Sequence, residues 1–280
     1  MKLGECDINP GWMSVYCSLS CDACHLRDPN VRCQRTRLEM DPNPIYAPGD
    51  MNKMFENIET EFGTVFEVNY LSRDPYVIQI DNFMSIDESN GIVKTVKTWE
   101  RSTDVGLSNS YGEVGRVLSQ SRTSSNAWCQ HECENDPYVK AVVARIERVT
   151  RVPWDNYESF QILRYEPGQF YRTHHDNGGT MELDPAGPRI LTFFLYLSDV
   201  EEGGETNFPQ LNISVKPKRG RAVLWPSTLD ASPGDIDPRT THAALPVKKG
   251  LKFAANSWIH LYNFRIPNLW GCTGSFDLPE

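Results

Sequence analysis

The sequence has little of what nucleic-acid-binding, membrane-spanning or repetitive proteins need. Its 28 Lys and Arg are outnumbered by 37 Asp and Glu, for a net charge of −9, whereas nucleic-acid-binding domains usually present a basic surface. It has no apolar run near the roughly 18 residues of a membrane span, and no repeat or low-complexity tract. The first ten residues lack the apolar centre of a signal peptide. We therefore expect no nucleic-acid partner and no membrane segment in this chain.

What the chain does contain is enough apolar and aromatic residues for a folded core. Hydrophobic residues make up 39% of the 280, with 12 Phe, 11 Tyr and 7 Trp, which excludes disorder throughout. Composition divides the chain into zones. We expect a Cys-rich module over residues 4–33, a linker over 34–72, one globular domain over 73–265 and a tail over 266–280.

The eight cysteines are unevenly placed. Five of them lie within the first 33 residues, and so short a segment needs either disulfides or a bound metal ion to stabilise its fold. Zinc sites usually pair two C-x-x-C knuckles, and only Cys21 and Cys24 form one here, so disulfides in an oxidising compartment are favoured. The later pair, Cys129 and Cys133, encloses His131; this is an incomplete zinc site, and a disulfide is again favoured.

Periodicity predicts two helices followed by a run of strands. Residues 85–101 begin with a capping-box spacing, Ser85 to Glu88, and residues 137–150 follow Asp136 as N-cap and bury one face. Short β-rich segments separated by Gly and Pro follow, which favours an antiparallel barrel or jelly roll with helical buttresses, an α+β class that is mainly β. One further predicted strand, residues 75–81, precedes both helices, and those that follow them are residues 159–166, 190–198, 212–216, 221–226, 243–247 and 251–261.

Three polar residues could form a metal site. If the strand continues, His174 and Asp176 point to one face and His175 to the other. His242 is the best remaining third ligand, and two His with one carboxylate form the facial triad of non-haem iron(II) oxygenases. A His-x-Asp pair alone more often consists of ordinary solvated side chains on a surface strand. The surrounding residues therefore decide whether a metal site is predicted.

Lys252 lies ten residues after His242 in an apolar, strand-like segment. An inward-facing ammonium is costly without an anion, and a dicarboxylate co-substrate would supply one. The alternative is a solvated strand lysine beside Lys248 and Lys249.

The order of His174 and Asp176, then His242, then Lys252 along the chain resembles that in the 2-oxoglutarate-dependent iron(II) dioxygenases of the prolyl 4-hydroxylase type. Lysyl hydroxylases and AlkB-type demethylases look similar but place Arg where this chain has Lys252. The resemblance covers about residues 73–265 and implies a double-stranded β-helix core. Supporting segments are residues 121–125, 163–171, 189–192, 203–209, 242–247 and 258–260.

This resemblance implies roles for individual residues. His174, Asp176 and His242 correspond to the iron ligands, and Lys252 to the partner of the distal carboxylate of 2-oxoglutarate. His175 occupies a variable position, and no catalytic role is expected for it. Tyr165 and Thr206 match hydrogen-bonding partners of 2-oxoglutarate, and Tyr171, Arg189, Trp258 and His260 match positions lining the peptide groove. Core packing is the alternative for Tyr171 and Trp258, as is a structural salt bridge for Arg189.

Residues 4–24 resemble the second half of a ShK toxin-like module, a six-cysteine domain of which this stretch matches the last four cysteines. The resemblance implies that Cys6 pairs with Cys21, leaving Cys17 and Cys24 without upstream partners. Either the chain begins inside a longer precursor or Cys33 recruits one of them. A disulfide-rich tail with no function of its own is the alternative.

Together these features predict a prolyl 4-hydroxylase acting on proline-rich peptides in the secretory pathway, in the endoplasmic reticulum lumen or Golgi. The implied cofactors are Fe(II), 2-oxoglutarate, O₂ and ascorbate. Two enzymatic alternatives are an oxygen-sensing hydroxylase and a free-proline hydroxylase. A non-catalytic peptide-binding subunit is the alternative from another class.

Overall fold

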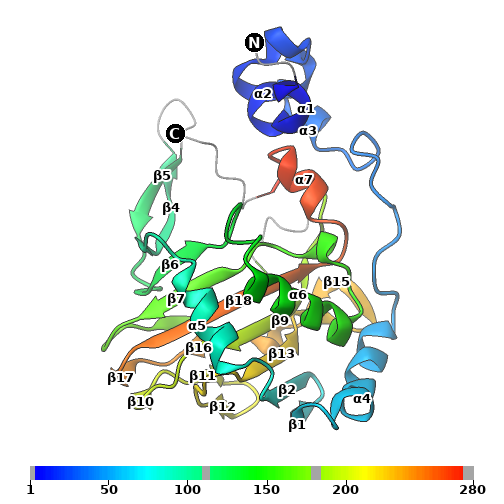
Figure 1. Ribbon diagram of the computed structural model, residues 1–280. Coiled ribbons are helices and arrows are strands. Elements are labelled where there is room, and N and C mark those ends of the chain that lie inside the picture. The colour runs from blue at the N-terminus through cyan, green and yellow to red at the C-terminus, as the bar shows by residue number, and fades with distance from the viewer. Residues whose placement is uncertain (1–3, 109–113, 178–183, 274–280) are drawn as a thin grey trace.

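Two antiparallel sheets form the body of the protein, with helices against the outer face of the larger one (Figure 1). The computed structural model describes residues 4–108, 114–177 and 184–273, with only the backbone described at 104–108 and 114–117. Within these ranges the larger sheet has eight strands in the order β1-β2-β13-β9-β18-β7-β6-β3. Their bounds are Glu67–Arg73 (β1), Tyr76–Asp81 (β2), Glu100–Arg101 (β3), Ser125–Trp128 (β6), Gln161–Tyr165 (β7), Arg189–Tyr196 (β9), Ala222–Pro226 (β13) and Lys252–His260 (β18).

The smaller sheet has the order β12-β11-β16-β8 and faces the inner side of the larger one. Its strands are Tyr171–His174 (β8), Thr206–Phe208 (β11), Ile213–Val215 (β12) and His242–Ala244 (β16). Three two-stranded ribbons complete the described strands: Thr103–Ser108 (β4) with Val114–Leu118 (β5), Glu202–Gly203 (β10) with Val247–Lys249 (β17), and Thr228–Leu229 (β14) with Ser232–Ile236 (β15).

Alternation along the strands of the larger sheet separates two hydrophobic clusters. On β9, Phe194 and Tyr196 point inward and pack with Phe208 of the smaller sheet. Phe193 and Leu195 point outward and join the cluster beneath the helices. The predicted jelly-roll architecture with flanking helices is therefore confirmed, and its interior opens between the two sheets.

The helices confirm one sequence prediction and correct another. Helix α6 runs from Pro137 to Thr150 as predicted, and the Asp136 side chain accepts from two backbone N–H groups at its start. Helix α5 has the predicted Ser85 capping box but spans Ile86–Lys94, so the predicted end at residue 101 is wrong. The Thr95 hydroxyl bonds back to a carbonyl of the last turn, and the chain then leaves for the edge strand β3.

The range predicted as a linker contains two regular elements. Helix α4 (Asp50–Phe62) buries Met51, Phe55 and Ile58 against the larger sheet, and β1 is the edge strand of that sheet. Periodicity was hidden here because β1 is half-exposed along most of its length. Where one domain ends and the next begins stays a prediction.

The predicted strands are present, with shifts of one or two residues at their ends. The exception is residues 243–247, which were predicted as one strand. They divide between β16 and β17, which belong to different sheets. Pro246 lies between the two strands and has no N–H to continue a ladder.

The N-terminal segment folds as short helices, namely α1 (Glu5–Ile8), α2 (Pro10–Tyr16), α3 (Pro29–Arg32), and the 3₁₀ turns Ser18–Cys21 and Cys24–Arg27. It contains the Cys6–Cys21 disulfide that the ShK resemblance implies. The suggestion that Cys33 pairs with Cys17 or Cys24 is wrong, because Cys33 is bonded to Cys272, after α7 (Arg265–Leu269). The predicted Cys129–Cys133 disulfide is present.

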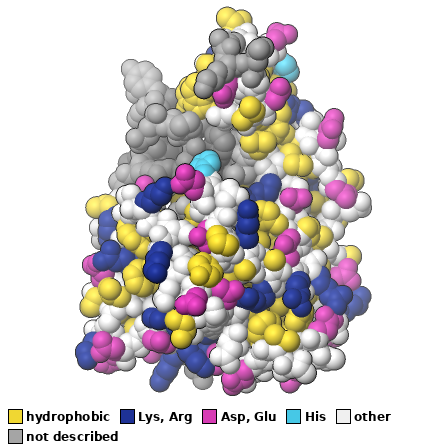
Figure 2. Space-filling model, in the orientation of Figure 1, with side chains coloured by type: hydrophobic (Ala, Val, Ile, Leu, Met, Phe, Trp, Pro, Cys, Tyr) yellow, Lys and Arg dark blue, Asp and Glu magenta, His cyan; other side chains and the backbone are white. Residues whose placement is uncertain are grey.

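Cys17 and Cys24 carry no disulfide within the described ranges. The part of the chain that the structure describes holds no helix with the length and apolarity to cross a bilayer. Acidic and basic side chains are interspersed over the face shown in Figure 2.

Candidate active site

Two neighbouring strands of the smaller sheet bring the three predicted metal ligands together. His174 ends β8, His242 begins β16, and these two residues are register partners. Asp176 follows β8, and its carboxylate lies 4.0 Å from Nε2 of His174 and 3.7 Å from Nε2 of His242. One ligating atom from each residue lies within 4.8 Å of the others. Residues 68 positions apart in sequence thus form one cluster because β8 and β16 pair.

Hydrogen bonds orient both histidine side chains of this cluster. Nδ1 of His174 bonds to the carbonyl of Arg172 at 2.9 Å, and Nδ1 of His242 bonds to that of Thr240 at 3.0 Å. With Nδ1 protonated, each ring turns the lone pair of Nε2 toward Asp176. The other ring nitrogen of each histidine is therefore free to bind an ion.

The electrostatics of this cluster favour the forms that bind a cation. Burial and the neighbouring His242 ring lower the pKa of His174 to about 3. Burial acts to raise the pKa of Asp176, but the two His rings and a 2.6 Å hydrogen bond from the Thr192 hydroxyl outweigh it and hold this pKa below its usual value. Neutral imidazoles and an ionised carboxylate are the ligating forms. Two nitrogens and one oxygen on one face fit a non-haem iron(II) centre.

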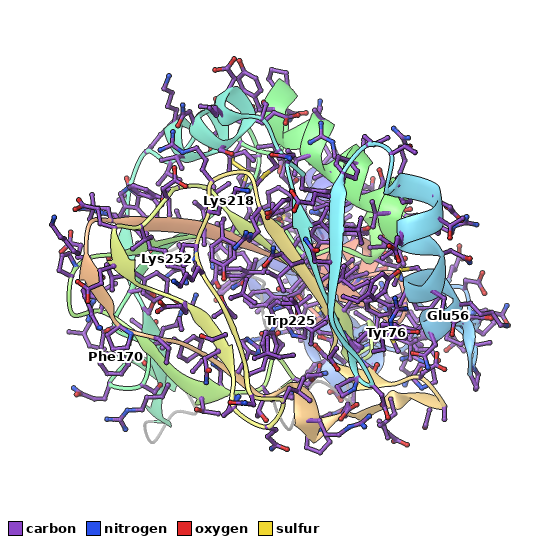
Figure 3. The ribbon with its side chains drawn as sticks, turned by 90° about the horizontal axis from the view of Figure 1, so that it is seen from below. Glu56, Tyr76, Phe170, Lys218, Trp225 and Lys252 are labelled. Carbon is purple, nitrogen blue, oxygen red and sulfur yellow. A yellow bond between two sulfur atoms is a disulfide. The ribbon has the colours of Figure 1, made fainter. Side chains whose placement is uncertain are left out.

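Lys252 lies deeper in the same interior and is fully buried (Figure 3). Its Nζ donates to the carbonyl of Gly204 at 2.8 Å and lies within 5.4 Å of the ring centres of Tyr165, Phe194 and Tyr196. No carboxylate of the described residues lies within ion-pair distance of Nζ. Burial lowers the pKa of Lys252 to about 7. The Glu205 charge acts to raise this pKa but does not offset burial. Lys252 therefore faces inward, and a buried ammonium at this place would be stabilised by an anionic ligand.

A small cavity lies beside two of the three predicted metal ligands. Its lining includes His174 and His242 together with Tyr165 and Thr206, but neither Asp176 nor Lys252. The Thr206 hydroxyl is bonded to that of Tyr196 at 2.6 Å, and Tyr165 is the cross-strand partner of Lys252. The other lining residues are Leu163, Tyr171, Phe194, Trp225, Ala243, Ala244 and Asn256.

Two of the residues predicted to line a peptide groove are aromatic, and one of them, Tyr171, lines this cavity. The Tyr171 ring stacks on His174 with centroids 3.6 Å apart. The Trp258 ring lies on the inner face of β18 beneath the Arg189 guanidinium, at 3.8 Å. The indole N–H of Trp258 is buried and has no hydrogen-bond partner among the described residues.

Arg189 and His260 converge on a carboxylate that sequence reasoning missed. Glu158 is 1% exposed and accepts from Arg189 and from Nε2 of His260. Burial acts to raise the pKa of Glu158, but Arg189 and His260 hold it well below its usual value. Arg189 also donates to the carbonyl of Asp176 at 2.8 Å. The salt-bridge alternative for Arg189 is thus present in the structure, and any role in peptide binding is additional to it.

His260 is 2% exposed, and its other nitrogen bonds to the Gly187 carbonyl at 2.8 Å. A role in substrate binding stays a prediction, and it would act through Glu158 and Arg189. Glu158 precedes a strand predicted at 159–166, and nothing in that pattern distinguishes it from a surface acid.

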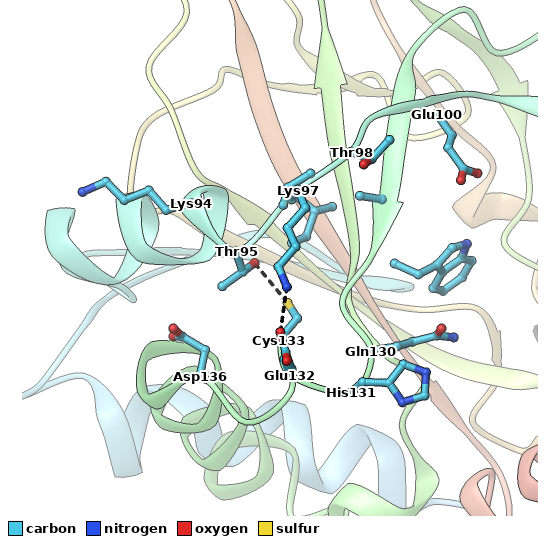
Figure 4. Close-up of a pocket in the computed structure, with 14 residues that line it drawn as sticks. Lys94, Thr95, Lys97, Thr98, Glu100, Gln130, His131, Glu132, Cys133 and Asp136 are labelled. Carbon is cyan, nitrogen blue, oxygen red and sulfur yellow. Dashed lines mark hydrogen bonds and ion pairs between the residues drawn. The ribbon is translucent and has the colours of Figure 1, made fainter.

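A larger hollow lies away from this site, on the outer side of the sheet (Figure 4). The α5–β3 segment and the Cys129–Cys133 turn form it, and the Lys97–Glu132 ion pair spans it at 2.7 Å. It contains none of the predicted site residues, so size alone does not identify the active site in this protein.

Comparison with known proteins agrees with this geometry. Residues 160–260 match the model of the 2OG-Fe(II) oxygenase superfamily. Prolyl 4-hydroxylase 1 of Arabidopsis thaliana is 36% identical over 68% of this chain and 70% of its own length. Probable prolyl 4-hydroxylase 9 of the same plant is 35% identical over 82% of this chain and 84% of its own length.

Among solved structures, a viral collagen prolyl hydroxylase from Paramecium Bursaria Chlorella virus-1, in a 2OG complex, is similar with a TM-score of 0.50. It is 29% identical and covers 66% of this chain and 95% of that one. Its similarity supports the jelly-roll assignment made from the strands above. This chain belongs to the prolyl 4-hydroxylases of the 2OG-Fe(II) oxygenase superfamily, whose cofactors are iron(II) and 2-oxoglutarate.

Proposed function

We propose that this enzyme hydroxylates C4 of proline in proline-rich peptides, with His174, Asp176 and His242 as the iron ligands. The observation that carries this proposal is the cluster of His174, Asp176 and His242, two of which line a cavity together with Tyr165, the cross-strand partner of buried Lys252. One O₂ and one 2-oxoglutarate are consumed for each proline. One oxygen atom enters the new hydroxyl group and the other enters succinate, with release of CO₂.

The chain's own residues orient and shield the reactants. Lys252 binds the distal carboxylate of 2-oxoglutarate, and the hydroxyl groups of Tyr165 and Thr206 complete that subsite. The buried walls exclude water, which strengthens the charge interaction. Iron(II) supplies the oxidising chemistry when it is bound with its co-substrates, and ascorbate is proposed to keep it reduced.

The substrate is proposed to be an extended peptide lying across Tyr171 and Trp258. Proline-rich chains hold the polyproline II conformation before they bind, and aromatic-lined grooves recognise them. The Trp258 N–H is buried and has no partner among the described residues, and we propose that it donates to a peptide carbonyl once the substrate is bound. Arg189 supports this wall through its contact with the Trp258 ring.

The three disulfides support a location in the secretory pathway, because disulfides form and persist in oxidising compartments. Within that pathway we propose the endoplasmic reticulum lumen or the Golgi, where nascent proline-rich chains pass. Fractionation of cells that express the protein, with lumenal markers for each compartment, tests this assignment.

The direct test compares His174→Ala with His25→Ala. His25 is an exposed histidine of the N-terminal segment, so its variant is the matched control. We expect His174→Ala to lose peptide-dependent succinate formation and His25→Ala to keep it. A His174→Ala enzyme that still decarboxylates 2-oxoglutarate with peptide present would contradict the ligand assignment.

Product analysis separates the remaining functional alternatives. Mass spectrometry of products from polyproline, an oxygen-sensor-type peptide and free proline should show a gain of one oxygen on polyproline. Hydroxylation of only the sensor peptide or only free proline would favour one of those enzymes. Iron bound at one equivalent without turnover on any prolyl substrate would favour a non-catalytic subunit.

A further inference from the structure

His175 lies between two of the ligand positions and contacts a different part of the chain. Its Nε2 lies 3.1 Å from the carbonyl oxygen of Asp237 and 3.3 Å from the hydroxyl of Thr240. Its Nδ1 lies 3.1 Å from the backbone N–H of Asn177. One neutral tautomer satisfies all three contacts, because a hydrogen on Nε2 is donated to the turn while Nδ1 accepts from Asn177.

The turn that His175 reaches also orients the third ligand. The carbonyl of Thr240 accepts from Nδ1 of His242 at 3.0 Å, and thereby sets the direction of Nε2. Asp237 and Thr240 are each 1% exposed, and the Arg239 guanidinium holds the Asp237 carboxylate at 2.7 Å. Because the turn is buried and internally bonded, a shift at its contact with His175 moves the Thr240 carbonyl and the His242 ring.

A second path joins Asp176 to the same turn. The Thr192 hydroxyl donates to the Asp176 carboxylate at 2.6 Å and lies 3.5 Å from the Ser227 hydroxyl. The backbone N–H of Asp237 donates to the carbonyl of Ser227 at 3.1 Å. The segments that carry the three ligands are therefore all connected to the Asp237–Thr240 turn. His175 is the side chain that connects the His174–Asp176 segment to this turn directly.

We propose that His175 is a positioning residue that sets where His242 stands relative to the other two iron ligands. The inference rests on the ligand assignment in the proposed function. It predicts that the hydrogen bonds of His175, and not its size, determine iron affinity. Outer hydrogen-bond partners of metal ligands commonly change metal affinity by about 10–100-fold.

The test compares two substitutions in the full, disulfide-bonded chain. His175→Phe keeps an aromatic ring of similar size but removes both hydrogen-bonding nitrogens. His175→Gln keeps one donor and one acceptor, which can serve Asp237 and Asn177. Thr173→Val, at an exposed position of β8, is the matched control.

Iron(II) is titrated anaerobically with 2-oxoglutarate present, and the visible absorption of the ternary complex reports binding. We expect His175→Phe to weaken iron(II) binding by about 10–100-fold, while His175→Gln and Thr173→Val stay within about threefold of the unmodified protein. At saturating iron, kcat of His175→Phe should return to within about threefold. A merely structural defect would lower kcat and thermal stability without recovery at high iron.

Iron affinity of His175→Phe equal to that of the unmodified protein overturns the inference, as does a loss in His175→Gln as large as in His175→Phe. If His175→Phe does not fold, Thr240→Val provides the second test, since it removes one contact with His175 and keeps the bulk. We expect it to weaken iron binding by about threefold or more, and an unchanged affinity counts against the proposal.

The His174→Ala variant separates this inference from the proposed function. If His174→Ala binds iron normally, the ligand assignment itself fails. If it loses iron while His175→Phe binds iron normally, the ligand assignment stands and only the positioning role is lost.

Discussion

Cys33 and Cys272, 239 residues apart in sequence, are joined by a disulfide that ties the N-terminal segment to the turn after α7. The same contact is reinforced by Arg32, whose Nε donates to the carbonyl of Trp270 at 3.0 Å, and by Arg37, whose guanidinium lies over the Trp270 ring. The N-terminal segment is thus fixed to the catalytic domain by a covalent bond and by side-chain contacts.

Replacing both Cys33 and Cys272 with Ser should loosen the N-terminal segment while the iron site stays intact. A crosslink that closes so long a loop stabilises a protein by about 2–4 kcal/mol. We expect a lower Tm and faster cleavage between residues 33 and 50 in limited proteolysis. Cys17→Ser removes an unpaired thiol and is the control. Proteolysis that is no faster in the double variant would show that the side-chain contacts suffice.

Lys252→Met should weaken 2-oxoglutarate binding, because the distal carboxylate would then be buried without a cation. Removing one partner of a buried charge pair costs roughly 2–4 kcal/mol, which is about a 30–1000-fold rise in Kd. Isothermal titration with Mn(II)-loaded protein measures this change. Lys53→Met, at an exposed position, is the control. An unchanged Kd for Lys252→Met would remove Lys252 from the co-substrate site.

The lowered pKa of Lys252 also predicts a pH dependence of co-substrate binding. The ammonium form binds the dianion, and in the unliganded protein this form is lost as pH rises through about 7. The Kd for 2-oxoglutarate should therefore rise by up to about tenfold per unit between pH 7.5 and 9, with uptake of a proton on binding. Titrations in buffers of different ionisation enthalpy measure that proton. The dependence should be absent in Lys252→Met, and a flat Kd in the unmodified protein contradicts the prediction.

Glu158→Gln should destabilise the fold at neutral pH and flatten its acid sensitivity. The pKa of Glu158 is lower in the folded state than in the unfolded chain, so its stabilising effect is complete above its ordinary pKa and is lost as pH falls below it. Breaking such a buried pair costs about 3–5 kcal/mol. Urea unfolding from pH 3 to 8 measures both effects. Glu201→Gln breaks an exposed pair with Lys249 and should change stability by less than about 1 kcal/mol. Parallel pH profiles for Glu158→Gln and the unmodified protein would contradict the prediction.

Trp258→Phe should raise the KM for peptide and leave the KM for 2-oxoglutarate unchanged. The substitution keeps an aromatic surface under Arg189 and removes the unpartnered N–H. Loss of one hydrogen bond of about 1 kcal/mol corresponds to about a fivefold rise in KM. Trp12→Phe in the N-terminal segment is the control. Equal effects on both KM values would indicate a general packing defect in place of a lost peptide contact.

Much of the active site could be predicted from the sequence because its chemistry is concentrated in short motifs. The alternation of a strand predicts that His174 and Asp176 share a face, and the two side chains do lie together although β8 ends at His174. Helix α6 could be bounded because Asp136, Pro137 and the apolar face are all local signals. Helix α4 escaped prediction because it lies among turn signals in a range read as a linker, and its buried face appears only against the sheet.

The sequence by itself determined the kinds of residues that are proposed to bind iron and the co-substrate, since ligand chemistry is a property of the side chains. Only the tertiary structure decided that β8 pairs with β16, which brings His174 to His242, and that Lys252 faces inward with no ion-pair partner among the described residues. The same holds for the Cys33–Cys272 bond and for Glu158 beneath Arg189. These contacts join residues far apart in the chain, and no local pattern specifies which distant strand or turn a side chain will meet.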